Sequence, residues 1–140
     1  DFVLNLNSKS EYRNPKQIRR TKMKNSKQYD LEDRTLEFAR RVRAIVKKLS
    51  RTIGNIEDGK QVVRSSGSVG ANYIEANESL SKKDFVMRIK ICRKEAKESR
   101  YWLRLLDISR NSEYEEERKA LIQEATELMN IFGSILRKSE

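Results

Sequence analysis

The 140-residue sequence contains no histidine, a single proline and a single cysteine. Without histidine it lacks the usual general base at neutral pH, the histidine of hydrolase triads and nearly every catalytic zinc site. It also lacks the Glu-x-x-His ligand pairs of di-iron four-helix bundles. These absences argue against an enzyme and predict neither a cofactor nor a bound metal.

Long apolar runs are also missing, since the longest are only a few residues, and this argues against a transmembrane helix. Residues 1–6 are too short and too polar for the apolar region of a signal peptide. The only cysteine, Cys92, cannot form an intramolecular disulfide, and its place on an apolar seam predicts an inert thiol. We therefore expect a soluble cytoplasmic protein with no membrane partner and no small-molecule substrate.

Positive charge is what the sequence has in excess. It holds 31 lysines and arginines against 21 aspartates and glutamates, a formal net charge of +10. Such an excess favours a polyanion partner such as RNA or DNA. Residues 1–28 are rich in cations and have no sustained apolar period, so we expect a basic, flexible N-terminal arm. Its candidate phosphate contacts are Arg19, Arg20, Lys22 and Lys24.

Residues 29–140 form the second predicted unit, in which apolar residues recur at alternating spacings of four and three, the period of an amphipathic helix. The pattern predicts helices over about 30–52, 57–79, 82–110 and 114–137, with the first break at Gly54 and Asn55. Short connections place consecutive helices antiparallel. The predicted fold is all-α, an up-down-up-down four-helix bundle.

Local signals refine three of these helices. Ser81 and Ser112, each with an acidic residue three positions later, resemble capping boxes at the starts of the third and fourth helices. The second helix carries a run of small residues that includes Gly67 and Gly70. Glycine inside a helix costs roughly 1 kcal/mol relative to alanine. We expect this cost to be accepted because small side chains allow a neighbouring helix to approach closely.

A second apolar line runs along the third predicted helix, on a different face from its core seam. Its members are Met87, Ile91, Tyr101, Leu105 and Ile108. Similar lines on the first and fourth helices leave two alternatives open. The bundle has a wide core that buries more than one seam, or the line is a surface through which copies of the chain associate.

Cations also recur along two of the predicted helices at helical spacings. The third helix carries Lys90, Arg93, Lys97, Arg100 and Arg104, and the first carries Arg40, Arg43, Lys47 and Arg51. A row of cations on a rigid helix suits the repeating phosphates of a nucleic acid. The alternative is a solvated surface whose charges pair locally, as Asp84 and Arg88 could.

Acidic residues offer one competing site, because Glu75, Glu78, Glu95 and Glu98 could converge inside the bundle as a metal-binding carboxylate cluster. Ion pairing of these residues with Arg64 or Arg100 is the simpler explanation. The acids at the start of the fourth helix favour the helix dipole rather than a metal.

The stretch from Val63 to Asn77 (VRSSGSVGANYIEAN), followed by Ser81–Phe85 and Lys94–Leu103, resembles the S23 or 23S rRNA intervening-sequence protein family. The resemblance covers about residue 24 to the C-terminus. It implies an up-down-up-down bundle that assembles into a ring, typically a homopentamer. The chain is also similar to the accessory protein of diversity-generating retroelements, a basic pentamer that binds nucleic acid and a reverse transcriptase. The family has no catalytic residues to transfer.

These observations predict a non-enzymatic, homo-oligomeric protein that binds RNA or DNA, with rRNA favoured, by contacting phosphates through its basic helix faces. The alternative is a protein-interaction scaffold or an accessory subunit of a nucleic-acid enzyme. A nuclease is the third possibility, and it requires a metal held by carboxylates such as Glu95 and Glu98.

Overall fold

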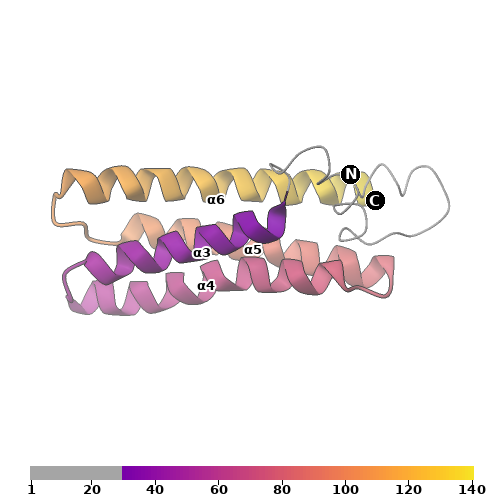
Figure 1. Ribbon diagram of the computed structural model, residues 1–140, viewed down its shortest axis with the longest axis horizontal. Coiled ribbons are helices and arrows are strands. Elements are labelled where there is room, and N and C mark those ends of the chain that lie inside the picture. The colour runs from indigo at the N-terminus through magenta and orange to yellow at the C-terminus, as the bar shows by residue number, and fades with distance from the viewer. Residues whose placement is uncertain (1–29) are drawn as a thin grey trace.

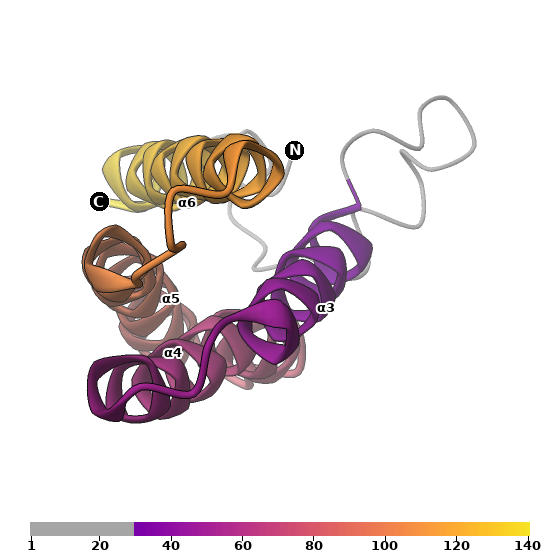
Figure 2. The same cartoon turned by 90° about the vertical axis from the view of Figure 1, so that its left-hand side faces the viewer.

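Residues 30–140 are described by the computed structural model, and within this range the chain is helical without any strand. The helices are α3 (Leu31–Lys48), α4 (Ile53–Asn77), α5 (Lys82–Leu105) and α6 (Ser112–Ser139). They run alternately up and down one long axis (Figure 1). Seen end on, they follow one another around that axis, so that α3 and α5 lie diagonally across the bundle (Figure 2). The predicted all-α four-helix bundle is confirmed.

The first helix ends earlier than predicted, and the predicted break at Gly54 and Asn55 is wrong. The chain leaves α3 at Leu49 and enters α4 at Ile53, so Gly54 and Asn55 lie in the first turn of α4. Thr52 caps this helix, because its Oγ1 accepts a hydrogen bond from the Asn55 amide at 3.1 Å. A capped first turn tolerates glycine because its amides have no partner within the helix.

The third helix ends at Leu105 rather than near residue 110. The amide of Asp107 donates to Asn55 Oδ1 at 2.8 Å, and Arg118 donates to the carbonyl of Leu106 at 2.5 Å. Both partners come from other helices, so periodicity along α5 could not indicate them. The connection then passes through Ser109 and Arg110, which both have positive φ, and a helix cannot continue through such residues.

Of the two caps predicted at the starts of α5 and α6, one is confirmed and the other is wrong. Ser81 Oγ accepts from the Asp84 amide at 3.1 Å, as the capping-box pattern predicts. The fourth helix starts at Ser112, two residues before the predicted start, and ends at Ser139. Its cap is Asn111, whose Oδ1 accepts from the Tyr114 amide at 3.0 Å, so assigning the cap to Ser112 was wrong by one position.

The small residues of α4 allow α3 to approach closely, as predicted. A Cβ at Gly70 would lie 2.8 Å from Thr35 Oγ1, and a Cβ at Gly59 would lie 3.1 Å from Val46. Neither distance accommodates a larger side chain without a shift of the neighbour.

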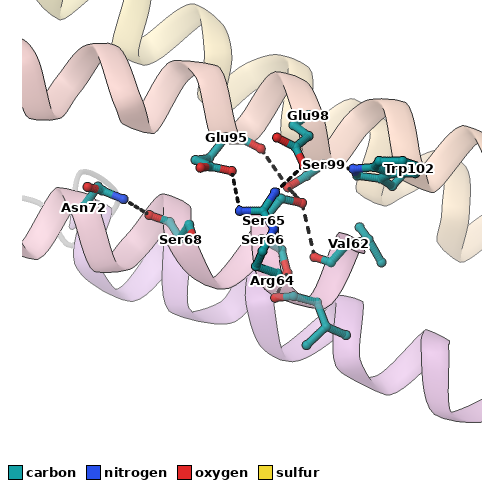
Figure 3. Close-up of polar contacts among 11 residues, drawn as sticks. Val62, Arg64, Ser65, Ser66, Ser68, Asn72, Glu95, Glu98, Ser99 and Trp102 are labelled. Atoms are coloured by element: carbon teal, nitrogen blue, oxygen red, sulfur yellow. Dashed lines mark hydrogen bonds and ion pairs between the residues drawn. The ribbon is translucent and has the colours of Figure 1, made fainter. Parts of the chain in front are cut away.

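The core follows the predicted seams and also buries several polar residues. Phe38, Phe85 and Phe132 are among the largest fully buried side chains. Between α4 and α5, Ser65 and Ser99 are both buried and share a hydrogen bond of 2.8 Å (Figure 3). Burial raises the pKa of the Cys92 thiol far above its ordinary value, which keeps the thiol protonated. No helix in the described range is long and apolar enough to cross a membrane.

Candidate nucleic-acid interface

Three acidic residues of α6 form ion pairs with α3. Arg34 donates to Glu124 and to Glu127, each at 2.7 Å. Arg41 pairs with Glu117 at 3.2 Å. The hydrogen bond with Glu124 raises the pKa of Arg34, and hydrogen bonds from Gln123 and then from Arg34 lower the pKa of Glu127. Three carboxylates of α6 thus lie on its α3 side and are neutralised there.

Acidic residues of α5 form ion pairs with α4 in the same way. Arg64 pairs with Glu95 at 3.4 Å and with Glu98 (Figure 3). Glu98 also accepts a hydrogen bond from Trp102 Nε1 at 3.0 Å. This bond, followed by the contacts with Arg64, lowers the pKa of Glu98. The predicted pairing with Arg64 is confirmed, and residues 30–140 hold no group of three or more carboxylate, thiol or imidazole side chains placed to bind a metal.

One of the suggested local pairs does not form. Arg88 donates to Asn72 Oδ1 of α4 at 3.0 Å, and no ion pair joins it to Asp84. The neighbouring helix therefore provides a better partner than the residue four positions earlier.

What remains between α5 and α6 is a surface of cations, which we call the α5–α6 basic face. It consists of Lys90, Arg93, Lys97, Arg100, Arg104 and Arg137. Within the described part of the chain none of these residues forms an ion pair. Arg100 donates to Thr126 Oγ1 of α6 at 3.2 Å, a neutral partner. Like charges gathered without a counter-charge favour the binding of an anion.

Arg137 belongs to this face although no periodicity in α5 could indicate it. A Cβ placed on Gly133 would lie 3.4 Å from Arg137 Nη1 and 3.9 Å from Arg93 Nη1. Arginines of two helices therefore flank one buried glycine. The available signal was a glycine inside an amphipathic helix with an arginine four residues later, which places both on one side of α6.

The predicted row on α3 has different surroundings. Arg40 lies 3.9 Å from Glu37, with both side chains largely exposed. Arg43 folds onto α4, where its Nη2 lies 3.3 Å from the Cβ position of Gly67. Lys47 and Arg51 are exposed and have no ion pair within residues 30–140. Placing Arg51 on the first helix was wrong, because α3 ends at Lys48 and Arg51 lies in the connection to α4.

The α3 row and the α5–α6 basic face are not brought together in one copy of the chain, because α3 and α5 are diagonal. The predicted arm, residues 1–28, with its candidates Arg19, Arg20, Lys22 and Lys24, lies outside the described residues.

The second apolar line of α5 is largely exposed. Met87, Tyr101 and Leu105 keep 46%, 57% and 49% of their surface open to solvent. Ile91 is half-buried. Including Ile108 in this line was wrong, because it lies beyond the end of α5 and packs against the core. The corresponding residues of α6, among them Ile122 and Met129, also pack against the core. The wide core therefore accounts for the second line of α6, and a strip on α5 stays uncovered.

Residues 27–134 match the family model described as 23S rRNA-intervening sequence protein. The chain belongs to this family. It is also similar to the crystal structure of a protein of unknown function from the S23 ribosomal protein family of Bacteroides thetaiotaomicron, with 35% sequence identity and a TM-score of 0.66. That match covers 76% of this chain and 97% of the other. No curated protein of established function matches this member of the 23S rRNA-intervening sequence protein family.

Proposed function

We propose that this family member is a non-enzymatic nucleic-acid-binding protein of the cytoplasm that holds phosphates on the α5–α6 basic face. The observation that carries the proposal is the sorting of charge. Carboxylates of α5 and α6 are paired towards α4 and α3, and six cations are left together without one. From Lys90 to Arg104 the row extends about 21 Å along the helix, enough for several phosphates.

RNA is the favoured partner among nucleic acids, and two observations support it. The matching family model names 23S rRNA, and the basic sequence of residues 1–28 adds positive charge to the same chain. Phosphate contacts of this kind position a nucleic acid without reading its sequence.

The exposed strip on α5 supports a second feature of the proposal, the association of copies of the chain. Met87 and Leu105 are half exposed on one helix, and Ile91 lies between them in the same line. We expect copies to join through this strip into the ring that the family resemblance implies. Several basic faces would then bind one RNA molecule together, which raises the avidity of the assembly for that RNA. A protein partner on the same strip is the alternative, in which the chain acts as a scaffold.

Replacing three cations of the basic face tests the proposal. The triple variant Arg93→Gln, Lys97→Gln, Arg137→Gln should bind a structured rRNA fragment at least about tenfold more weakly than the wild type at low salt. The slope of log Kd against log salt should fall by about 0.7 to 0.9 for each phosphate contact removed. Gel-shift titrations at several salt concentrations measure both quantities.

The matched control is Lys47→Gln, Lys48→Gln, Lys60→Gln, which removes the same charge from exposed positions of α3 and α4 and should change affinity by less than about threefold. If both variants lose affinity equally, the loss comes from net charge alone and the α5–α6 basic face is not the binding site. A wild-type protein that forms no complex at low salt would reject nucleic-acid binding. Pulldown of a protein partner that persists after nuclease treatment would favour the scaffold.

A further inference from the structure

Tyr101 lies where the exposed apolar strip of α5 meets the basic face. Lys97 is four residues before it and Arg104 three residues after it, so both are its neighbours on the helix surface. The tyrosine is 57% exposed, the largest open fraction among the aromatic residues of the described chain. An exposed aromatic ring beside a row of cations is the arrangement by which proteins bind unpaired nucleotides.

The ring is also held in place rather than left free. Tyr101 packs against Trp102 with 5.0 Å between ring centroids and 77° between the ring planes. Trp102 is fixed in turn by the hydrogen bond of its Nε1 to Glu98, and Glu98 is fixed by Arg64 of α4 (Figure 3). This chain of contacts connects the tyrosine to the packed α4–α5 seam. A ring already ordered before binding loses less conformational freedom when a ligand stacks on it.

We propose that Tyr101 is a stacking platform for an unpaired base, and that the α5–α6 basic face therefore prefers single-stranded to double-stranded nucleic acid. The cations contact the phosphates, and the ring receives the base. A base in a duplex is already stacked and cannot reach the ring without unpairing. Glu98 and Trp102 act as positioning residues, since neither offers a comparable open surface. The inference rests on the proposed function of the basic face and adds to it the class of nucleic acid.

The same ring was included in the predicted contact surface between copies, and the two uses compete for it, so the platform requires that copies join through the Met87 and Ile91 end of the strip. An interface would bury Tyr101, whereas a stacking platform must stay open. Their consequences also differ. A substitution at an interface lowers the mass of the assembly and weakens the binding of single strands and of duplexes alike. A substitution at the platform weakens the binding of single strands only.

The test compares Tyr101→Ala with Tyr101→Phe in the full chain. The probes are a labelled single-stranded RNA of about 12 nucleotides, within the usual range of site sizes, and the duplex of that strand with its complement. Anisotropy at one salt concentration gives the Kd for each probe. Tyr101→Ala should weaken single-strand binding about tenfold and leave duplex binding within about twofold. Tyr101→Phe, which keeps the ring, should restore the wild-type Kd.

The matched control is Leu36→Ala, another half-exposed apolar side chain, which lies on α3 away from the basic face. It should leave both affinities unchanged. Trp102, the only tryptophan, provides a second readout. Its fluorescence should change when the wild type binds the single strand, and this change should be lost in Tyr101→Ala.

The inference is overturned if Tyr101→Ala leaves single-strand binding unchanged, or weakens both probes equally together with a lower solution mass. Either result leaves the proposed function standing, provided that the triple variant of the basic face still loses affinity. If the wild type binds neither probe, the proposed function itself fails.

Discussion

The α3–α4 and α5–α6 halves of the bundle each carry a row of cations at the same helical spacing, yet their surfaces differ. In the first half, glycines allow tight contact and Arg43 lies over Gly67 of the adjacent helix. In the second half, Arg93 of α5 and Arg137 of α6 both lie beside Gly133, so positive charge from two helices gathers at one place.

The difference shows that the surroundings of a helix's cations depend on the helix beside it. α6 presents its carboxylates to α3, where Arg34 and Arg41 meet them, and presents Thr126 and Arg137 to α5. The same residues on an isolated helix would be an ordinary solvated surface.

Asn55 joins the two halves at the end of the bundle where their connections meet. Replacing it should have the largest effect on stability. Its side chain is 6% exposed, donates to the carbonyls of Ser50 and Asp107 at 3.0 and 2.9 Å, and accepts from the Asp107 amide at 2.8 Å. Asn55→Ala leaves these groups without partners and should lower the free energy of unfolding by about 3 kcal/mol. Urea unfolding measures it.

Asn72→Ala is the control, because Asn72 is half-buried and bonds only within α4 and to Arg88. It should cost under about 1 kcal/mol. If both variants lose the same stability, Asn55 does not hold the halves together.

The two glycines Gly70 and Gly133 should respond to alanine with opposite signs. At Gly70 the new Cβ would lie 2.8 Å from Thr35 Oγ1, and β-branched Thr35 cannot move aside, so the variant should lose about 2 kcal/mol of stability. At Gly133 the nearest atom is the flexible end of Arg137, 3.4 Å away. Gly133→Ala should gain up to about 1 kcal/mol from helix propensity. Equal destabilisation would mean that the second half is packed as tightly as the first.

Replacing the α3 row should have a smaller effect on RNA than replacing the basic face. Arg40→Gln, Lys47→Gln, Arg51→Gln removes three charges, but Arg40 and Lys47 lie on the helix diagonal to α5 and Arg51 lies in the connection that follows it. We expect the affinity to fall by no more than about threefold, against at least about tenfold for the matched triple variant of the basic face. Filter binding of both variants under one buffer makes the comparison. A larger loss from the α3 row would move the site to the first half.

A pH titration should produce the smallest effect and separate the paired acids from the basic face. The pKa of Glu98 is lowered by Trp102 and Arg64. Its contribution to stability is therefore fully present above the ordinary carboxyl pKa of about 4.3 and is lost as the pH falls through the lowered value. Trp102 fluorescence should follow this loss, since protonation weakens the bond from its Nε1. In Glu98→Gln the transition should disappear. A transition that persists would assign it to another carboxyl.

Much of the fold was predictable because it depends on local periodicity. The seams through Phe38, Phe85 and Phe132 are read from spacing alone, and all three are buried. The Ser81 cap was predictable for the same reason, as its partner is three residues away. The ends of α3 and α5 were not, because Asn55 and Arg118 act across the bundle on residues distant in the sequence.

By itself the sequence determined four amphipathic helices, an excess of positive charge, the absence of histidine chemistry and the resemblance to the 23S rRNA-intervening sequence protein family. These are properties of composition and of neighbours three and four residues apart. Only the tertiary structure decided which cations remain unpaired, that Arg137 joins those of α5, and that Arg64 of α4 holds Glu98, the partner of Trp102. Each depends on which helix lies next to which, and Coulomb and hydrogen-bond energies are set by that distance in space, whatever the separation along the chain.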